Sequence, residues 1–319
     1  MTDHPSISVA IPLYNEETVI PELLRRLSAV LDEMPGGPHE IVFTDDGSKD
    51  TTLALLEQAS RTNDRIRVIS LARNFGHQQA LSAALDHVSG DVTIMMDGDL
   101  QDEPESIGEL INTYKQGFDV VYAVRTQRKE GFILRTAYTL FYRIMNALSD
   151  IHMPLDSGDF ALVSRAVVEQ MRTMPERHRY LRGLRAWVGF RQTGIRVERQ
   201  ARAGGVSKYS WTGLIRLALD GVFSFSVLPI RIATLLGLLA VAFSLAYGGY
   251  AAFVRVFLSN HVPGFTTLYL MIMLTFGVNL FVLGILGEYI GRIYNEVKGR
   301  PIYVIRKVIG APKPSDTQE

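Results

Sequence analysis

The chain has 319 residues and a mass of 35.6 kDa, which exceeds one average domain and predicts one large domain with an appendage. Lys and Arg together number 33, as do Asp and Glu, so the net charge is zero and bulk attraction to nucleic acid is excluded. The chain contains no cysteine, which excludes disulfides, thiolate metal sites and a cysteine nucleophile, and fits a domain that faces the reducing cytosol.

Residues 7–124 alternate short β-branched runs with helical patterns. The expected strands are Ile7–Ile11, Glu40–Thr44, Arg67–Leu71, Val92–Met96 and Asp119–Val124. The expected helices are Glu17–Glu33, Thr51–Arg61, His77–Val88 and Pro104–Gln116. This alternation predicts an α/β fold with a mostly parallel sheet covered by helices on both faces. In such sheets, ligands collect at the carboxyl ends of the strands.

The next stretch, residues 125–200, is mixed in pattern and richer in Arg. Asp159–Ser164 and Gly194–Glu198 are candidates for two further strands. The glycine-bearing segment Ala203–Tyr209 is expected to be a flexible loop. The weakly charged segment Thr212–Leu228 fits a helix in the membrane interface or a core helix, and its pattern does not decide between them.

Two uncharged runs follow, Ile232–Val254 of 23 residues and Val262–Gly287 of 26 residues, and each is long enough to span a bilayer. A buried hairpin of a soluble protein is the disfavoured alternative. Neither run has an ionisable residue in its interior, which argues against an ion pathway. More Lys and Arg lie outside the pair of runs than between them. The positive-inside rule therefore places both termini and the N-terminal domain in the cytoplasm of a multi-pass plasma-membrane protein.

Polar side chains follow the first two expected strands. After the first, Asn15 and Glu16 are suited to hydrogen bonds with a base or ribose, and Tyr14 is suited to packing on it. A helix start with Asn15 as its N-cap explains the same residues. The second strand ends in two adjacent acids before a glycine turn, and Asp46 is the expected nucleoside-binding carboxylate.

Asp97 and Asp99, with Gly98 between them, follow the fourth expected strand. Two carboxylates at this spacing can share one hard cation, Mg²⁺ or Mn²⁺, whose open positions a nucleotide diphosphate fills. A solvated acidic loop is the alternative. The position after an apolar strand, beside two other polar strand ends, favours a metal site.

The ordered motifs PLYNE, DDGSKDT, RNFGHQQAL, DGDLQDEP and SGDF, with a GVSKY loop and two candidate spans, resemble the polyprenyl-phosphate glycosyltransferases of glycosyltransferase family 2. The resemblance covers nearly the whole chain and is strongest to bactoprenol glucosyltransferases, with dolichyl-phosphate mannose synthases as relatives. It implies a GT-A fold and metal-dependent, inverting transfer of one sugar to undecaprenyl phosphate, with UDP-glucose as the favoured donor. A GDP-mannose or UDP-amino-sugar donor, or an inactive nucleotide-binding partner of a lipid-sugar flippase, are the alternatives.

The resemblance also implies roles for individual residues. Those expected around the nucleotide are Pro12, Tyr14, Asn15, Glu16, Asp46 and Gly98. Asp97 and Asp99 are the expected metal ligands, with Gln101 near the metal and the acceptor phosphate. A mobile segment over the diphosphate is expected at Ser207, Lys208 and Tyr209, and the acceptor phosphate is expected at Arg125 and Arg135. Solvated arginines near anionic lipid are the alternative for that pair.

Asp159, in the motif SGDF, matches the acid that is usually proposed as the base in related enzymes. A phosphate monoester with a second pKa of about 6 is already largely dianionic at neutral pH and scarcely needs a base. The sequence therefore gives Asp159 a catalytic role without deciding whether it removes a proton or orients the acceptor. A capping or salt-bridging acid is the structural alternative.

The expected organisation is a GT-A domain at 1–210, an interfacial amphipathic helix at 211–230, a transmembrane hairpin at 231–290 and a cytoplasmic tail at 291–319. The resemblance favours a homotetramer, and Gly237, Gly248 and Gly249 permit close helix contacts. Where processive synthases carry Gln-x-x-Arg-Trp, this chain has RGLRAW at residues 182–187, which favours a single transfer over polymerisation.

Overall fold

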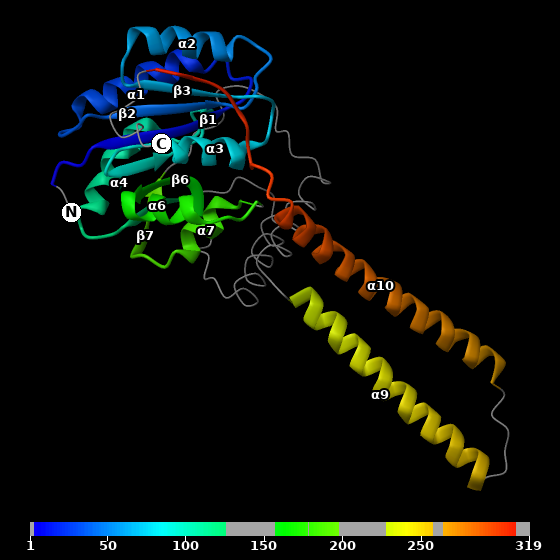
Figure 1. Cartoon of the computed structure of the whole chain (residues 1–319). Helices are drawn as coiled ribbons and strands as arrows, with labels where there is room; N and C mark the ends of the chain where they lie inside the picture. The colour runs from blue at the N-terminus through cyan, green and yellow to red at the C-terminus, as the bar shows by residue number, and fades with distance from the viewer. Residues whose placement is uncertain (1–2, 126–156, 178, 198–227, 258–263, 311–319) are drawn as a thin grey trace. The chain divides into compact units, whose positions relative to one another are not determined.

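The computed structural model describes residues 3–125, 157–177, 179–197, 228–257 and 264–310 (Figure 1). The chain forms two compact units. The first, which we call the α/β unit, comprises Met1–Tyr142, Ile151–Lys208 and Arg300–Glu319, and the second, the helical unit, comprises Arg143–Asp150 and Tyr209–Gly299. Of the expected interfacial helix at 211–230, only residues 228–230 are described, and they form the start of the long helix Leu228–Phe257.

The α/β unit alternates strands and helices along the chain (Figure 1). The strands are β1 Ile7–Leu13, β2 Glu40–Asp45, β3 Ile66–Leu71, β4 Val92–Met95, β5 Val120–Arg125, β6 Ser157–Ser164, β7 Gln192–Val197 and β8 Ile305–Ile309. The helices are α1 Ile20–Glu33, α2 Thr52–Thr62, α3 His77–Asp86, η1 Pro104–Ser106, α4 Ile107–Tyr114, α6 Arg165–Thr173 and α7 Leu181–Trp187.

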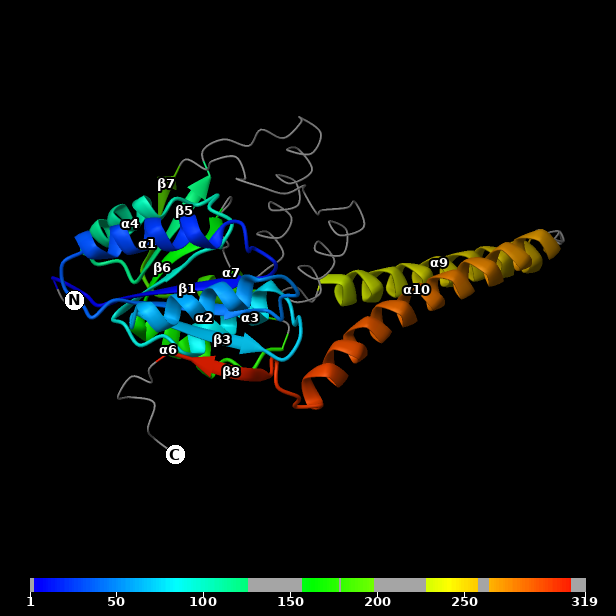
Figure 2. The ribbon, with the colours of Figure 1, turned by 90° about the horizontal axis from the view of Figure 1, so that it is seen from above.

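The eight described strands form one sheet in the order β7-β5-β6-β4-β1-β2-β3-β8, with β7 and β8 at opposite edges (Figure 2). Strands β1 to β4 run parallel to one another, and β7 runs parallel to β5. Strand β6 runs antiparallel to both of its neighbours, and β8 runs antiparallel to β3. The predicted mostly parallel sheet is confirmed.

Successive side chains of a strand point to opposite faces of the sheet, and both sets are apolar here, so both faces of the sheet are apolar. On β1, Val9 and Ile11 belong to a core with α1, α2 and α4, whereas Ala10 belongs to a second core with α3, α6 and α7. All three residues are fully buried. The sheet is therefore covered by helices on both faces, as predicted.

The expected strands and helices of residues 7–124 are confirmed, with ends that shift by at most three residues. The two candidate strands become β6 and β7. Helices α6 and α7 and strand β8 were not predicted. Strand β8 lies in the segment expected to be a tail, where Arg306 and Lys307 interrupt the apolar pattern, as charged residues commonly do on an exposed edge strand.

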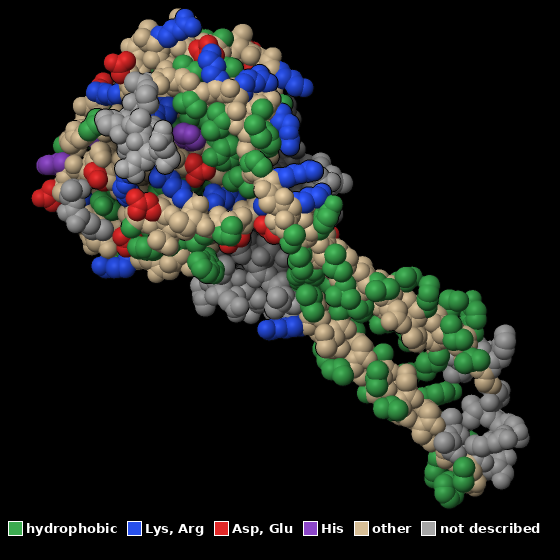
Figure 3. All heavy atoms as spheres, viewed as in Figure 1, with side chains coloured by type: hydrophobic (Ala, Val, Ile, Leu, Met, Phe, Trp, Pro, Cys, Tyr) green, Lys and Arg blue, Asp and Glu red, His purple; other side chains and the backbone are tan. Residues whose placement is uncertain are grey.

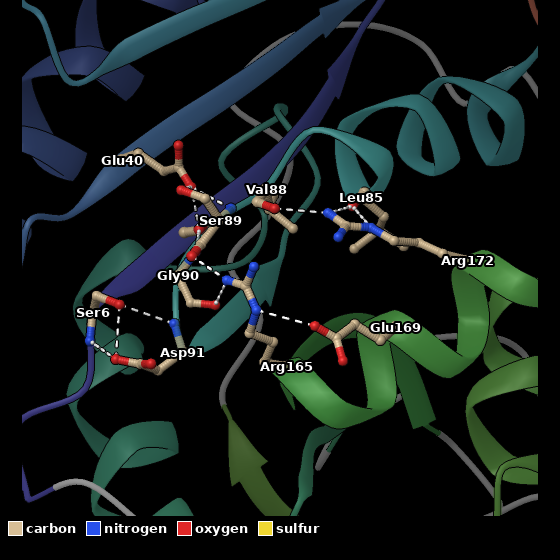
Figure 4. Close-up of polar contacts among 11 residues, drawn as sticks. Ser6, Glu40, Leu85, Val88, Ser89, Gly90, Asp91, Arg165, Glu169 and Arg172 are labelled. Carbon is tan, nitrogen blue, oxygen red and sulfur yellow. Dashed lines mark hydrogen bonds and ion pairs between the residues drawn. The ribbon is translucent and has the colours of Figure 1, made fainter. Parts of the chain in front are cut away.

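Hydrogen bonds from two sides hold the turn between α3 and β4 (Figure 4). The backbone N–H and the hydroxyl of Ser89 donate to Oε1 of the buried Glu40, at 2.6 and 2.8 Å. From α6, the guanidinium of Arg172 donates to the carbonyl oxygens of Leu85 and Val88, at 2.6 and 2.7 Å. The Arg172 contacts satisfy the carbonyl group of Leu85, near the end of α3, and that of Val88, which follows the helix, and they attach α6 to this turn.

The C-terminal segment, which comprises β8 and the residues just before it, contacts three other elements. Strand β8 pairs with β3, and its Lys307 donates to Glu57 of α2 at 2.9 Å. Just before the strand, the hydroxyl of Tyr303 donates to Asp86 at the end of α3 at 2.6 Å. Burial, together with the hydrogen bond to Asp86 and its negative charge, raises the pKa of the Tyr303 phenol. The segment after the last long helix is thus an integral edge of the α/β unit.

The helical unit contains α9 Leu228–Phe257 and α10 Phe265–Val297. Both are long and apolar enough to cross a membrane, over Pro229–Tyr250 and Met271–Val297, with mean hydropathies of 1.9 and 1.8. Their apolar side chains are mostly exposed in the chain itself, as Figure 3 shows, unlike those of a soluble core helix. The two predicted runs are confirmed as helices; α10 begins three residues later than expected and extends ten residues further.

We predict that Tyr303→Phe lowers the free energy of unfolding by about 1–2 kcal/mol, because the change leaves a partly buried carboxylate without its hydrogen bond. The midpoint of thermal unfolding in detergent should fall by about 2–8 °C. Lys307→Gln is the control, since its ion pair is more exposed and should cost less than about 1 kcal/mol. Equal midpoints for the two variants would show that Tyr303 does not anchor β8.

Candidate functional site

The candidate site forms where the carboxyl ends of β1 to β4 meet at one edge of the sheet. Strand β6 begins at this edge, because it runs antiparallel to β4. The register pairs Met95 with Ala161, and two further residues along each strand bring Asp97 opposite Asp159. Residues far apart in sequence therefore meet for a topological reason, as is general for ligand sites of α/β sheets.

The loops after β1 and β2 are fastened to each other. The backbone N–H of Asn15 donates to the hydroxyl of Ser48 at 3.0 Å, and the N–H of Lys49 donates to the side-chain oxygen of Asn15 at 2.9 Å. Asn15 has a φ of 53°, a left-handed conformation that asparagine tolerates better than most residues. The alternative that Asn15 caps a helix is wrong, since α1 begins only at Ile20.

Asp46 ties the loop after β2 to the loop after β3. Its two carboxylate oxygens accept the backbone N–H groups of Phe75 and Gly76, at 2.7 and 2.9 Å. Burial raises the pKa of Asp46, and the two N–H donors oppose that shift. The residue expected to bind the nucleoside thus also shapes the loop that leads into α3.

Two glycines allow close approach of neighbouring segments. Gly47 has a φ of 69°, and a Cβ there would lie 2.6 Å from the carbonyl carbon of Arg73. A Cβ on Gly98 would lie 2.2 Å from Cδ2 of the buried Leu13. The loops at the site are therefore packed too closely for any side chain at these two positions.

His77, Asp97 and Asp159 bring their donor atoms within 4.8 Å of one another. Nε2 of His77 lies 3.3 Å from Oδ1 of Asp97 and 3.9 Å from Oδ2 of Asp159. Burial raises the pKa of Asp97, and His77 opposes this shift while the other acids add to it. A partly buried carboxylate whose charged form is destabilised favours a cation beside it.

Asp159 is paired with Arg182 of α7. The guanidinium Nε and Nη2 donate to the two carboxylate oxygens at 2.5 and 2.6 Å, in the bidentate geometry that Arg and carboxylate favour. Burial alone would raise the pKa of Asp159, but the charge and the hydrogen bonds of Arg182 outweigh it and lower the pKa to about 2. Behind this pair, Arg185 is fully buried with both terminal nitrogens 3.4 Å from the carbonyl oxygen of Gly158, and burial lowers its pKa to about 10.

Asp97 belongs both to the predicted metal pair, Asp97 and Asp99, and to the cluster that it forms with His77 and Asp159. The other member, Asp99, accepts the backbone N–H of Gln101 at 3.2 Å through Oδ1, in the loop that follows β4. Carboxylate oxygens are the ligands that Mg²⁺ and Mn²⁺ prefer, and the donor set around Asp97 fits such an ion. Whether Asp99 is a second ligand stays a prediction.

The other predicted residues divide into two groups. Pro12 is buried at the end of β1, Tyr14 and Glu16 are half-buried in the turn after it, and Arg125 is the last residue of β5. Outside the described residues lie Arg135, Ser207, Lys208 and Tyr209.

Sequence reasoning missed the roles of His77 and Arg182 at the site. His77 stands in the motif RNFGHQQAL, and the available signal was its position at the start of a helix that follows a strand end. Arg182 offered no such signal, because its partner Asp159 is 23 residues away and helix α7, which carries Arg182, was not predicted.

Residues 8–172 match the family described as glycosyl transferase family 2, and residues 228–293 match the GtrB C-terminal hairpin. Glycosyltransferase YkcC of Bacillus subtilis is 39% identical over 311 residues, covering 97% of this chain and 96% of YkcC. A prophage-derived bactoprenol glucosyl transferase of Shigella flexneri is 39% identical over 302 residues, covering 94% and 97%. Among solved structures, a mannosyltransferase of Pyrobaculum calidifontis in complex with GDP-Man and Mn²⁺ has 16% identity and a TM-score of 0.47, covering 93% of this chain and 88% of that one.

We predict that Gly47→Ala lowers the free energy of unfolding by about 1–3 kcal/mol, because the residue has a left-handed φ and its Cβ would clash with the backbone of Arg73. The loop after β2 must then move away from Arg73, so affinity for a nucleoside diphosphate such as UDP, the kind of ligand expected at this edge, should also fall. Gly108→Ala in α4 is the matched control, since its Cβ would make only ordinary contact at 3.5 Å. Thermal unfolding and titration calorimetry measure both effects, and unchanged UDP affinity in Gly47→Ala would contradict the site.

Proposed function

The chain belongs to glycosyl transferase family 2, and we propose that it transfers one glucose from UDP-glucose to undecaprenyl phosphate, with inversion at the anomeric carbon and with Mg²⁺ or Mn²⁺ as cofactor. The enzyme is a glycosyltransferase with a GT-A fold. The product would be a polyprenyl-phosphate-linked sugar for the modification of cell-surface glycans. The single observation that carries the lipid acceptor is the pair of long apolar helices that accompanies the family 2 domain.

A polyprenyl acceptor explains why a sugar transferase needs such helices. The acceptor phosphate lies at the level of the lipid headgroups while its tail stays in the hydrocarbon, so the enzyme has to be held at the bilayer. Relatives of similar length and 39% identity are named bactoprenol glucosyl transferases, which supports this class of acceptor. The Lys and Arg distribution around the helices supports cytoplasmic termini and a cytoplasmic α/β unit.

The nucleotide would lie over the carboxyl ends of β1, β2 and β4. Pro12, Tyr14, Asn15, Glu16, Asp46 and Gly98 line this edge or shape it. Asp97 and Asp99, with Gln101 beside them, would hold the divalent cation. A cation bound there neutralises charge on the departing nucleoside diphosphate.

The transfer step needs little proton chemistry. A phosphate oxygen of the acceptor forms a bond to the anomeric carbon as the bond from that carbon to the UDP oxygen breaks, and UDP leaves with the bonding electrons. Because the acceptor monoester is largely dianionic at neutral pH, no proton has to leave the nucleophile. Arg125 and Arg135 are proposed to hold this phosphate, and the segment Ser207–Tyr209 to cover the diphosphate.

We further propose a homotetramer that associates through the apolar helices. A Cβ on Gly237, Gly248 or Gly249 would meet nothing within 4 Å in the single chain, so these positions leave room for a neighbouring helix.

The proposal is tested by incubating detergent-purified full chain with radiolabelled UDP- and GDP-sugars, undecaprenyl phosphate and Mg²⁺ or Mn²⁺, with EDTA as the control. We expect a chloroform-soluble product from UDP-glucose that disappears with EDTA. A product from GDP-mannose or from a UDP-amino-sugar alone would correct the donor. No product from any donor, in protein shown by calorimetry to bind UDP, would contradict the proposed function.

Asp99→Ala should reduce transfer by at least about 100-fold, because the cation would lose a carboxylate that balances its charge. The matched control is Asp64→Ala, which removes an exposed acid between α2 and β3 and should leave the rate within about twofold. Initial rates at saturating UDP-glucose measure the difference. Retained activity in Asp99→Ala would remove this residue from the metal site.

A further inference from the structure

The pair formed by Asp159 and Arg182 bears on the role of Asp159 in the proposed reaction. Asp159 lies near the start of β6 with 5% of its surface exposed, and Arg182 lies in the first turn of α7 with 24% of its side chain exposed. Both carboxylate oxygens accept a hydrogen bond from the same guanidinium. A carboxylate held in this way is fixed in position, and its negative charge is stabilised rather than available to a proton.

Helix α7 is itself anchored, so Arg182 is not a loosely placed surface cation. The backbone N–H of Leu181 donates to Oε1 of Gln78 at 2.9 Å, which ties the start of α7 to the first turn of α3. At the other end, Nε2 of Gln192 donates to the carbonyl oxygen of Arg185 at 3.0 Å. The same residue, Arg185, approaches the carbonyl oxygen of Gly158, next to Asp159.

The first turn of α3 connects this pair to the rest of the site. His77 lies between Asp97 and Asp159, while the adjacent Gln78 holds the residue before Arg182. A displacement of Asp159 or of α7 would therefore reach His77 and Asp97 through direct contacts.

We propose that Arg182 is a positioning residue, which holds Asp159 as a permanent carboxylate that orients His77 and Asp97, and that Asp159 does not serve as the base of the reaction. This inference rests on the proposed transfer to a phosphate acceptor, which is already largely dianionic at neutral pH. Asp159 then acts by its fixed charge, as the counter-ion of Arg182 and as a neighbour of the cation site.

A double-mutant cycle on Asp159 and Arg182 distinguishes the two roles of Asp159. If Asp159 is held as the partner of Arg182, the Arg182 variant should be the less active single variant; if Asp159 is the base, the Asp159 variant should be. Arg182→Gln leaves a buried carboxylate without its partner, which costs more than removing both charges. We expect kcat to fall on the order of 100-fold in Arg182→Gln, but only about 10-fold in Asp159→Asn, because a small displacement of site groups is sufficient for losses of this size. The double variant Asp159→Asn/Arg182→Gln should recover about 10-fold over Arg182→Gln.

The assay is transfer of radiolabelled glucose by the full chain, with kcat and the KM for UDP-glucose measured separately and folding checked by thermal unfolding. We expect the KM to stay within about threefold and Arg182→Lys to retain more activity than Arg182→Gln. If Asp159 is the base, Asp159→Asn will be the least active single variant and the double variant will be no better, which would overturn the inference. Loss of all activity in every variant would overturn it as well.

If the proposed function is wrong, the experiment gives a result that differs from failure of this inference. In that case the unaltered chain would transfer no sugar from any donor, whereas the unfolding midpoints of the same variants would still report on the ion pair. We expect the midpoint of Arg182→Gln to be the lowest and that of the double variant to lie above it. A double variant less stable than Arg182→Gln would contradict the pairing itself.

Discussion

The antiparallel placement of β6 beside β4 is the constraint on which the site depends. Parallel strands alone would gather only the loops that follow β1 to β4 at the carboxyl edge. Because β6 enters the sheet from that edge, Asp159 near its start faces Asp97 just after the end of β4. Helix α7 then supplies Arg182 from the same side. One reversal of strand direction thus brings an acid from the second half of the α/β unit to the acids of the first half.

The close approach of these residues determines how their charges are balanced. Asp97 and Asp159 are close enough to share His77, and burial disfavours a negative charge on each of them. Arg182 compensates Asp159 directly, whereas Asp97 is left with a raised pKa beside an imidazole. The proposed divalent cation would suit such an asymmetric site, because it would balance Asp97 while Arg182 already balances Asp159.

The sequence predicted the fold through residue 124 because strongly apolar strands and helices with regular spacing alternate there. It predicted that Asp46 and Asp97 each follow such a strand, and the structure has both residues at the carboxyl ends of β2 and β4, while their roles stay predictions. It missed α6, α7 and β8, since these elements are short or rich in Arg and Lys and depend on tertiary contacts, such as the hydrogen bond from Arg172 to the carbonyl oxygen of Leu85 in α3. The partnership of Asp159 with Arg182 was likewise unpredictable, because it depends on how a short helix is held against β6.

The most direct test of this account is hydrogen exchange of the purified full chain, with and without UDP and Mn²⁺. The account predicts slower exchange in residues 12–18, 45–51 and 96–102, which form the carboxyl edge of the sheet. Residues 72–78, which Asp46 ties to this edge, should slow with them, while residues 85–91 at the opposite edge should be unaffected. Protection confined to residues 85–91, or spread evenly over the α/β unit, would contradict the assignment of the site.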